Sequence, residues 1–308
     1  MLKNYIIAVL IFSCQFCTVV TAQSADKQSL SALETPHYKI LHDTTGAEAK
    51  EIATILEFAY ERFNYLFTAN GFTLLTPLEK LTWYCFTDAD GFTNHARTAD
   101  NMNLYWLNSY YSAKTNAVSI VKPYNLPNLN TNQDSAESAV AGVYIMPSVD
   151  TSGSEITRIL HEAAHQLAFN TGMQKQKVMY PVWLSEGLAA NFENCIPTSA
   201  GNLRQRRLCE MYSGRDRLIP LNEFILITRM PESSDLRKDI YAQSCVFFKF
   251  LSEHHSESLR KYMSALCGLR TGWRSRAALH TEFIAAFGPV REMEDSWLNY
   301  LKDISAEQ

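Results

Sequence analysis

The pentapeptide His161-Glu162-Ala163-Ala164-His165 constrains the fold of this chain more than any other segment. Its two histidines are four residues apart, so in an α-helix they lie on one face, one turn from each other. Two imidazoles at this spacing are typical ligands of a Zn²⁺ ion, and a glutamate directly after the first histidine is typical of the general base beside the ion. The segment can have this chemistry only if it is helical.

The flanking residues predict such a helix. Ser152-Gly153-Ser154-Glu155 has the pattern of a capping box, and the helix is expected to end near Gly172. Apolar residues follow with helical period, at Ile156, Ile159, Leu160, Ala163, Ala164 and Leu167. The pentapeptide therefore lies on a predicted amphipathic helix.

A second predicted helix supplies further acidic groups. Pro181 favours the start of a helix that carries Glu186 and Glu193. A catalytic zinc site usually has three protein ligands and one open position, so Glu186 is where the third ligand is expected. Glu193 is seven residues further along the same face. It could orient a ligand histidine through a hydrogen bond, or it could be a solvated or capping carboxylate.

The amino terminus predicts export. Lys3 precedes an apolar run from Tyr5 to Val20, and small residues follow up to Ala22, so residues 1–22 are predicted to be a cleaved signal peptide and residues 23–35 a flexible leader. The alternative is an uncleaved anchor, but polar residues such as Gln15 interrupt the apolar run. We expect a periplasmic or extracellular protein without stable membrane insertion after cleavage.

Composition narrows the choice of partners. The formal net charge is −4 at pH 7 and no basic stripe is present, so nucleic acid is not an expected partner. Without the signal peptide an odd number of cysteines remains, which leaves at least one unpaired. We expect a Cys195–Cys209 disulfide and buried thiols at Cys85 and Cys245. The fifth cysteine is Cys267.

The chain divides into an α+β part at 36–150 and a mostly helical part at 151–305 that carries the zinc site. In the first part, Asp88 is expected to cap a short helix. Strands are predicted at 37–41, 81–86 and 140–146, with a hairpin over 110–121 and a helix over 47–67. In the second part, further helices are predicted at about 202–213, 235–254, 257–268, 275–287 and 290–304.

The pentapeptide together with Trp183-Leu184-Ser185-Glu186-Gly187-Leu188-Ala189 resembles the gluzincins, zinc metallopeptidases whose third ligand is a glutamate on a following helix. Over Pro181–Glu193, Asp239–Ser244 and Phe283–Gly288 the chain is also similar to an uncharacterised family of exported bacterial proteins with a gluzincin-like domain. The resemblance implies an α+β, zincin-like metallopeptidase fold. Such a fold has a twisted mixed sheet beside the zinc-binding helix, followed by a mostly helical carboxy-terminal subdomain.

The same resemblance implies one Zn²⁺ per chain and a peptide or protein substrate. The ligands of this ion would be His161, His165 and Glu186, and Glu162 would be the general base. Tyr241 would be either a hydrogen-bond donor to the reaction's oxyanion or a core tyrosine.

Related peptidases bind the substrate backbone on an exposed edge strand. Val118–Val121 and Val143–Met146 are both candidates for that strand. No Gly-x-Met-Glu-Asn-type motif for a free amino terminus is present in the sequence. The sequence therefore gives no support for an aminopeptidase specificity.

Two other functions fit the same residues. The chain could be a zinc-binding protein of the cell envelope with this fold and no peptidase activity. It could also be a zinc hydrolase of a non-peptide amide, since an open position on the metal suits any carbonyl.

Overall fold

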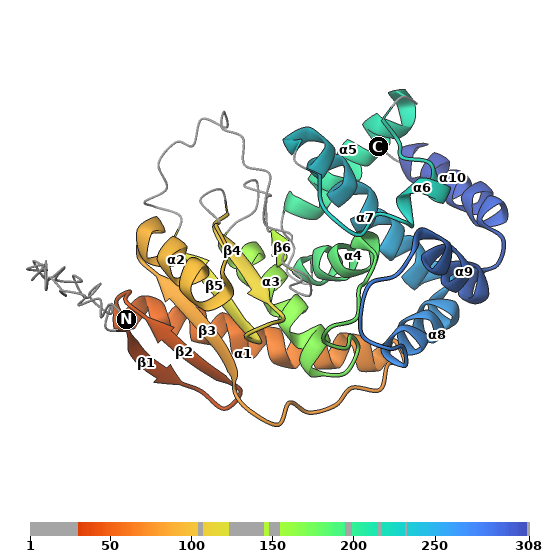
Figure 1. Cartoon of the computed structure of the whole chain (residues 1–308). Coiled ribbons are helices and arrows are strands. Elements are labelled where there is room, and N and C mark those ends of the chain that lie inside the picture. The colour runs from red at the N-terminus through yellow and green to blue at the C-terminus, as the bar shows by residue number, and fades with distance from the viewer. Residues whose placement is uncertain are drawn as a thin grey trace, which may run out of the picture.

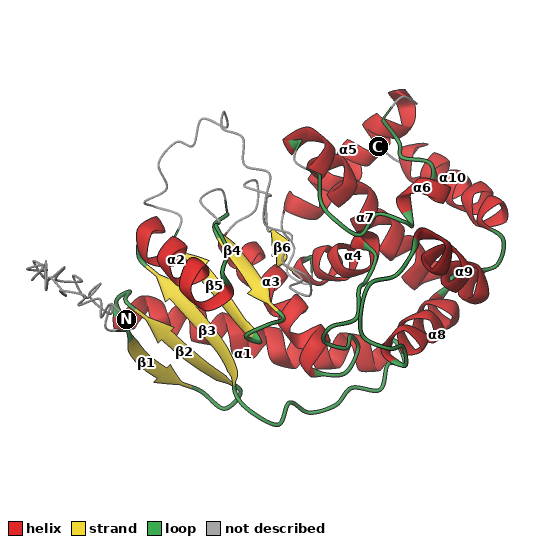
Figure 2. Ribbon diagram, viewed as in Figure 1, coloured by secondary structure: helices red, strands yellow, loops and turns green. Residues whose placement is uncertain are grey.

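The computed structural model describes residues 30–103, 107–122, 145–147, 155–194, 199–214, 217–231 and 233–306. The predicted signal peptide lies outside the described residues, as do the serines and glycine of the predicted capping box. The fold is mixed α+β, with a sheet in the first half of the chain and helices in the second (Figures 1 and 2).

The described sheet has six strands in the order β1-β2-β3-β5-β4-β6. β2 and β3 are parallel, as are β3 and β5, whereas the β1–β2, β5–β4 and β4–β6 pairs are antiparallel. The strands are β1 Ser31–Glu34, β2 Tyr38–His42, β3 Leu81–Phe86, β4 Ser109–Ser112, β5 Ala117–Val121 and β6 Ile145–Pro147. The predicted hairpin over 110–121 is confirmed as β4 and β5.

Side chains alternate between the two faces of the sheet, as the pleat requires. On β3, Trp83 and Cys85 belong to the main core beneath α1 (Gly46–Ala69) and α3 (Glu155–Asn170), whereas Phe86 faces a smaller cluster under α2 (Ala89–His95). Asp88 caps α2 as predicted, because its side chain accepts the hydrogen bond of the Gly91 backbone N–H. Helix α3, which carries His161 and His165, therefore lies directly on the sheet.

One glutamine fastens α3 to three points of the sheet region. The Trp83 indole donates to Gln166 Oε1 over 2.7 Å. The Gln166 amide in turn donates to the backbone carbonyls of Thr82 and Asn116, over 3.1 and 3.2 Å. A buried amide with all these partners fixes both the position and the rotation of the helix.

The helical half packs on the other side of α3 (Figure 1). Its helices are α4 Val182–Glu193, α5 Ser199–Gly214, α6 Leu221–Phe224, α7 Ser234–His254, α8 Ser256–Cys267, α9 Arg276–Phe287 and α10 Val290–Ala306. α4 is buried along almost its whole length between α3 and α7. The division predicted near residue 150 corresponds to a change of secondary structure, from the strands of the sheet to a series of helices. Helix α3 contacts both parts.

Two sequence-based expectations need correction, and two short helices were not predicted. The leader predicted over 23–35 is wrong for Ser31–Glu34, which forms β1 because its backbone pairs with β2 and Leu33 packs on the core. The π-helix η1 (Ala96–Asp100) and α6 are too short for a periodic pattern to predict. Pro181, expected in the first turn of α4, is instead the N-cap residue directly before it and makes no side-chain cap hydrogen bond.

The disulfide prediction is also wrong. Cys209 is a free thiol, buried among core side chains on α5, and Cys195 lies outside the described residues. Cys85 and Cys245 are buried free thiols, as predicted, and Cys267 is free and half-buried. Spacing in sequence suggested the pair, but Cys209 forms no disulfide in the structure.

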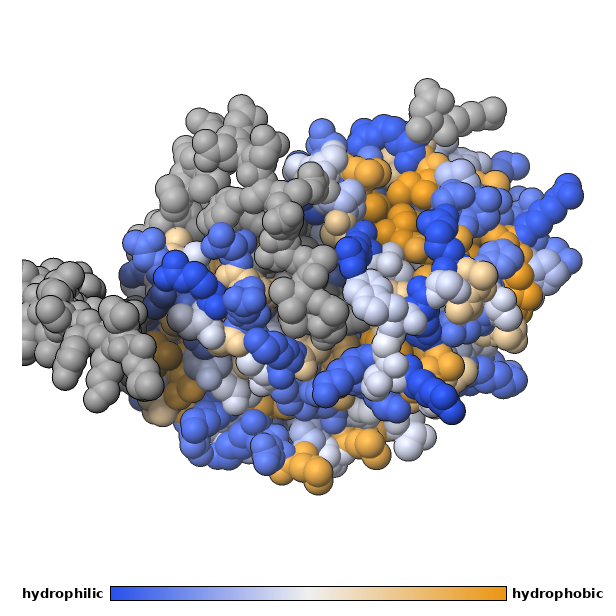
Figure 3. Space-filling model, viewed as in Figure 1, coloured by the Kyte–Doolittle hydropathy of each residue, from blue (hydrophilic) through white to orange (hydrophobic). Residues whose placement is uncertain are grey.

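Within the described residues, no helix combines the length and apolarity needed to cross a membrane. On the face shown in Figure 3, apolar surface gathers over the helical half. Trp273 is among the exposed large side chains of this half, and the guanidinium of Arg229 stacks on its ring.

Candidate metal centre

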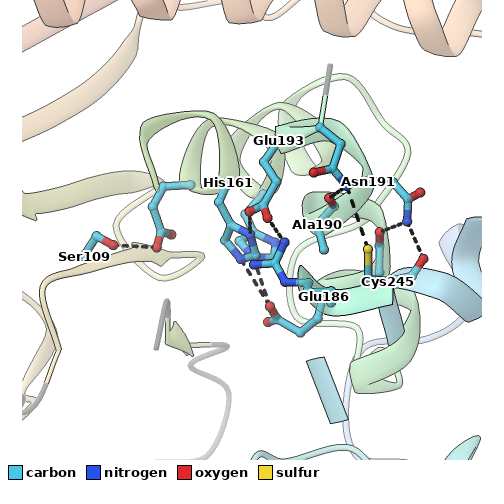
Figure 4. A network of polar contacts seen from close by, with 12 residues as sticks. Ser109, His161, Glu186, Ala190, Asn191, Glu193 and Cys245 are labelled. Carbon is cyan, nitrogen blue, oxygen red and sulfur yellow. Dashed lines mark hydrogen bonds and ion pairs between the residues drawn. The ribbon is translucent and has the colours of Figure 1, made fainter. Parts of the chain in front are cut away.

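Three predicted ligands converge between α3 and α4. His161 and His165 lie one turn apart on the face of α3 turned toward α4. Glu186 projects from α4 toward His161 (Figure 4). The two Nε2 atoms are 3.1 Å apart, and Glu186 Oε2 lies 3.2 Å from His161 Nε2 and 3.7 Å from His165 Nε2. All three side chains are buried.

These separations fit a single metal ion. Two ligand atoms that are each about 2.0–2.1 Å from a tetrahedral ion are separated by about 3.3 Å. The observed spacings of 3.1 to 3.7 Å bracket that value. In the described part of the chain, this is the cluster of histidine, cysteine and acidic side chains that could hold a metal ion.

Glu193 determines which nitrogen of His161 can bind a metal. His161 Nδ1 lies 2.9 Å from Glu193 Oε2, so Nδ1 carries the proton and donates it to this carboxylate. The Nε2 lone pair is then directed toward His165 and Glu186. Of the two interpretations of Glu193, orientation of a ligand histidine agrees with this contact.

The charge states also suit metal binding. Burial lowers the pKa of His165, an effect that the neighbouring Glu186 carboxylate only partly offsets, so its imidazole is neutral near pH 7. Burial acts to raise the pKa of Glu186, but the charges and hydrogen bonds of His165 and His161 outweigh burial and bring that pKa down to about 2. The cluster offers two imidazole nitrogens and one carboxylate, a suitable ligand set for Zn²⁺.

Glu162, the predicted base, is fully buried beside this cluster. Its Oε1 accepts a hydrogen bond of 2.9 Å from the Ser109 hydroxyl of β4. Within the described residues its Oε2 has no hydrogen-bond partner. Burial raises the pKa of Glu162 to about 7, against the opposing effects of His161 and of the hydrogen bond from Ser109. One oxygen of the Glu162 carboxylate is thus held by Ser109 and the other is available. The pKa of this carboxyl group suits proton transfer near neutral pH.

Sequence reasoning missed Ser109 and also Arg204, which forms a buried ion pair with Glu193. Ser109 begins an ordinary strand, and only strand order reveals that it faces α3. Arg204 lies in the basic run Arg204-Gln205-Arg206-Arg207, where no local signal distinguishes one arginine from another.

Tyr241 is brought to the site by α7. It is 4% exposed, and its ring centroid lies 6.3 Å from that of His161. Burial, reinforced by the charges of Glu186 and Glu162, raises its pKa well above 10, so the phenol keeps its proton. Tyr241 therefore meets the electrostatic requirement for a neutral hydrogen-bond donor near the cluster.

The topology decides between the two candidate edge strands. Val118–Val121 is part of β5, which pairs with β3 on one side and β4 on the other, so it has no free edge for a substrate. β6 lies at the end of the described sheet, beside β4, and remains the candidate. Val143 lies outside the described residues.

Comparison with known protein families gives one match. Residues 155–267 match the family model described as "Protein of unknown function (DUF1570)". The matched segment begins at the first residue of α3 and ends at the last residue of α8, so it contains the three ligand candidates, Glu162 and Tyr241 but not the sheet. No curated protein matches the chain.

Proposed function

We propose that this protein is a zinc-dependent metallopeptidase that hydrolyses peptide bonds. The observation that carries the proposal is the geometry of His161, His165 and Glu186, whose donor atoms are spaced as the ligands of one tetrahedral ion. A bound Zn²⁺ would polarise the scissile carbonyl and make water a nucleophile at neutral pH. The buried carboxylate of Glu162 on the same helix adds the base that hydrolysis needs.

Each remaining residue has a defined part in this reaction. Glu162, held by Ser109 through Oε1, takes the proton of the attacking water on Oε2 and passes it to the departing amine. Tyr241, a neutral phenol, donates a hydrogen bond to the oxyanion of the tetrahedral intermediate. Glu193 keeps His161 in the tautomer that a metal requires.

We further propose that the architecture is a zincin-like metallopeptidase fold of gluzincin type. A mixed sheet lies beside the helix that carries the two histidines, and the third ligand comes from the helical half that follows. The edge of β6 would pair with an extended peptide substrate by adding a strand to the sheet. The apolar run after Lys3 supports a secreted or periplasmic location.

The test is cleavage of a diverse peptide library by the mature protein, with products identified by mass spectrometry. Glu162→Gln is the matched variant, because it keeps the shape and the acceptor for Ser109 but removes the base. Glu155→Gln, at the start of the same helix, is the control. We expect cuts by wild type and by the Glu155→Gln control, no cuts by Glu162→Gln, and equal zinc content in all three.

Two results would contradict the proposal. If zinc-loaded wild-type protein cuts no peptide, two other functions would remain: an envelope zinc protein without peptidase activity and a zinc hydrolase of another amide. A panel of N-acetylated sugars and cross-linked cell-wall fragments separates these two. Cleavage that persists in Glu162→Gln would exclude Glu162 as the base.

A further inference from the structure

A buried chain of charged groups extends from the metal-ligand cluster into α5. His161 Nδ1 donates to Glu193 Oε2, and the other carboxylate oxygen of Glu193 forms an ion pair with the guanidinium of Arg204. Glu193 is 1% exposed and Arg204 is 6% exposed. Figure 4 shows the Glu193 carboxylate beside the His161 ring, on the side away from Glu186.

The two contacts together fix the Glu193 carboxylate. An ionised carboxylate is stable in the protein interior only when its charge is paired and its oxygens have hydrogen-bond donors. One oxygen of Glu193 is taken by the imidazole and the other by Arg204, so the plane of the carboxylate is defined from both sides. If the guanidinium were removed, the carboxylate would be left with an uncompensated charge and freedom to rotate.

We infer that Arg204 is a positioning residue of the metal centre, acting on His161 through Glu193. This inference rests on the proposed zinc site. A metal-ligating histidine is oriented by the partner of its second nitrogen, and changing such a partner typically weakens metal affinity about 10- to 100-fold. Arg204 holds that partner, so part of the same loss is expected when Arg204 is changed.

Because Arg204 lies on α5, its contact with Glu193 also couples the metal site to the docking of α5. Arg207, three residues after Arg204, forms an ion pair of 2.8 Å with Asp239 on α7. Residues of α5 thus contact both the metal-ligand cluster and the helix that carries Tyr241. Linkage is reciprocal, so if docked α5 favours metal binding, a bound metal must favour docked α5.

The experiment measures zinc affinity by competition with a chromophoric chelator. The proteins are wild type, Arg204→Met, Glu193→Gln and the double variant. We expect Arg204→Met to bind zinc about tenfold more weakly than wild type, and the double variant to bind no more weakly than Glu193→Gln alone. Arg204→Lys, which keeps a positive charge beside Glu193, should recover part of the affinity. If Arg204→Met fails to fold, comparing the double variant with Glu193→Gln still tests the inference, because the double variant buries no unpaired charge.

Arg207→Met is the matched control, because it removes an arginine from the same helix whose partner is Asp239. Its zinc affinity should stay close to that of wild type, because Asp239 keeps its ion pair with Arg217 and the Arg204–Glu193 pair is untouched. As a second readout, zinc should slow hydrogen exchange of the α5 amides in wild type, and do so less in Arg204→Met.

Three outcomes would overturn the inference while leaving the proposed function intact. These are tight zinc binding by Arg204→Met, losses that simply add in the double variant, and an equal loss in Arg207→Met. Failure of the wild type to bind zinc would overturn the proposed function, and the role of Arg204 with it.

Discussion

Gly187 of α4 lies so close to Ser244 of α7 that a Cβ atom at residue 187 would be 2.6 Å from the Ser244 carbonyl oxygen. The same atom would be 2.6 Å from the Cβ of Phe248. These distances are shorter than any ordinary van der Waals contact, so only glycine permits this approach of the two helices. Because Gly187 follows Glu186 directly, the contact sets how the third ligand candidate lies relative to Tyr241 on α7.

Replacing Gly187 by alanine should therefore destabilise the protein. One contact is with backbone, which cannot rotate away, so α4 and α7 must separate at a cost of about 1–3 kcal/mol. Thermal unfolding measures the loss, and zinc affinity should fall because Glu186 moves. Gly214→Ala is the control, since a Cβ there meets nothing within 4 Å. An unchanged melting temperature for Gly187→Ala would show that the helices are not held at this spacing.

Ser109→Ala should reduce hydrolysis without reducing zinc content. The change removes the donor to Glu162 Oε1 and lets the base rotate, so kcat should fall about tenfold or more while KM changes little. Ser112→Ala is the control. Ser112 is equally buried on β4, but it donates to Asp100, on the other face of the sheet, over 2.6 Å. Comparable kcat values for the two variants would mean that the Ser109 hydrogen bond does not position the base.

Glu162→Gln should stabilise chelator-treated protein at alkaline pH. Burial raises the pKa of Glu162 to about 7 from its ordinary 4.5, so the folded state holds a proton that the unfolded state has released between these values. Folding stability of wild type attributable to this group therefore falls as pH rises from 4.5 to 7. The variant should exceed wild type by on the order of 1–3 kcal/mol at pH 8 and match it near pH 4. Urea unfolding at both pH values is the measurement, and a difference that is constant with pH would contradict the shift.

Removal of the metal should lower the unfolding temperature. A ligand that binds only the folded state stabilises it by about 4 kcal/mol when present at 1,000 times its dissociation constant. Wild type should therefore melt higher with added Zn²⁺ than with chelator. Glu186→Gln, which removes the carboxylate of the site, should lose most of this difference. An equal response in Glu186→Gln would place zinc elsewhere on the chain.

The parts of the site that follow from local spacing could be predicted from the sequence. His161 and His165 share a helix face by periodicity alone, and Glu186 lies on a helix whose start Pro181 indicates. Ser109 and Arg204 could not be predicted, because their roles depend on which strand and which helix pack against α3. Strand order is set by long-range pairing, which a single sequence does not reveal.

The errors have the same origin. Ser31–Glu34 falls within a polar, Ser- and Ala-rich stretch that is typical of a leader, yet pairing with β2 makes it a strand. The Cys195–Cys209 disulfide was predicted from proximity in sequence, whereas the side chain of Cys209 is directed into the core. In each case a tertiary contact overrides a local tendency.

The anchoring of α3 by Gln166 has a consequence for the order of events in biogenesis. α3 is fixed to the sheet through this glutamine, while Glu186 comes from α4, so the three ligand atoms meet only when α4 has packed against α3. Metal capture would thus follow the packing of these two helices. If the chain is exported unfolded, as the apolar run after Lys3 predicts, it would acquire its ion in the compartment where it arrives.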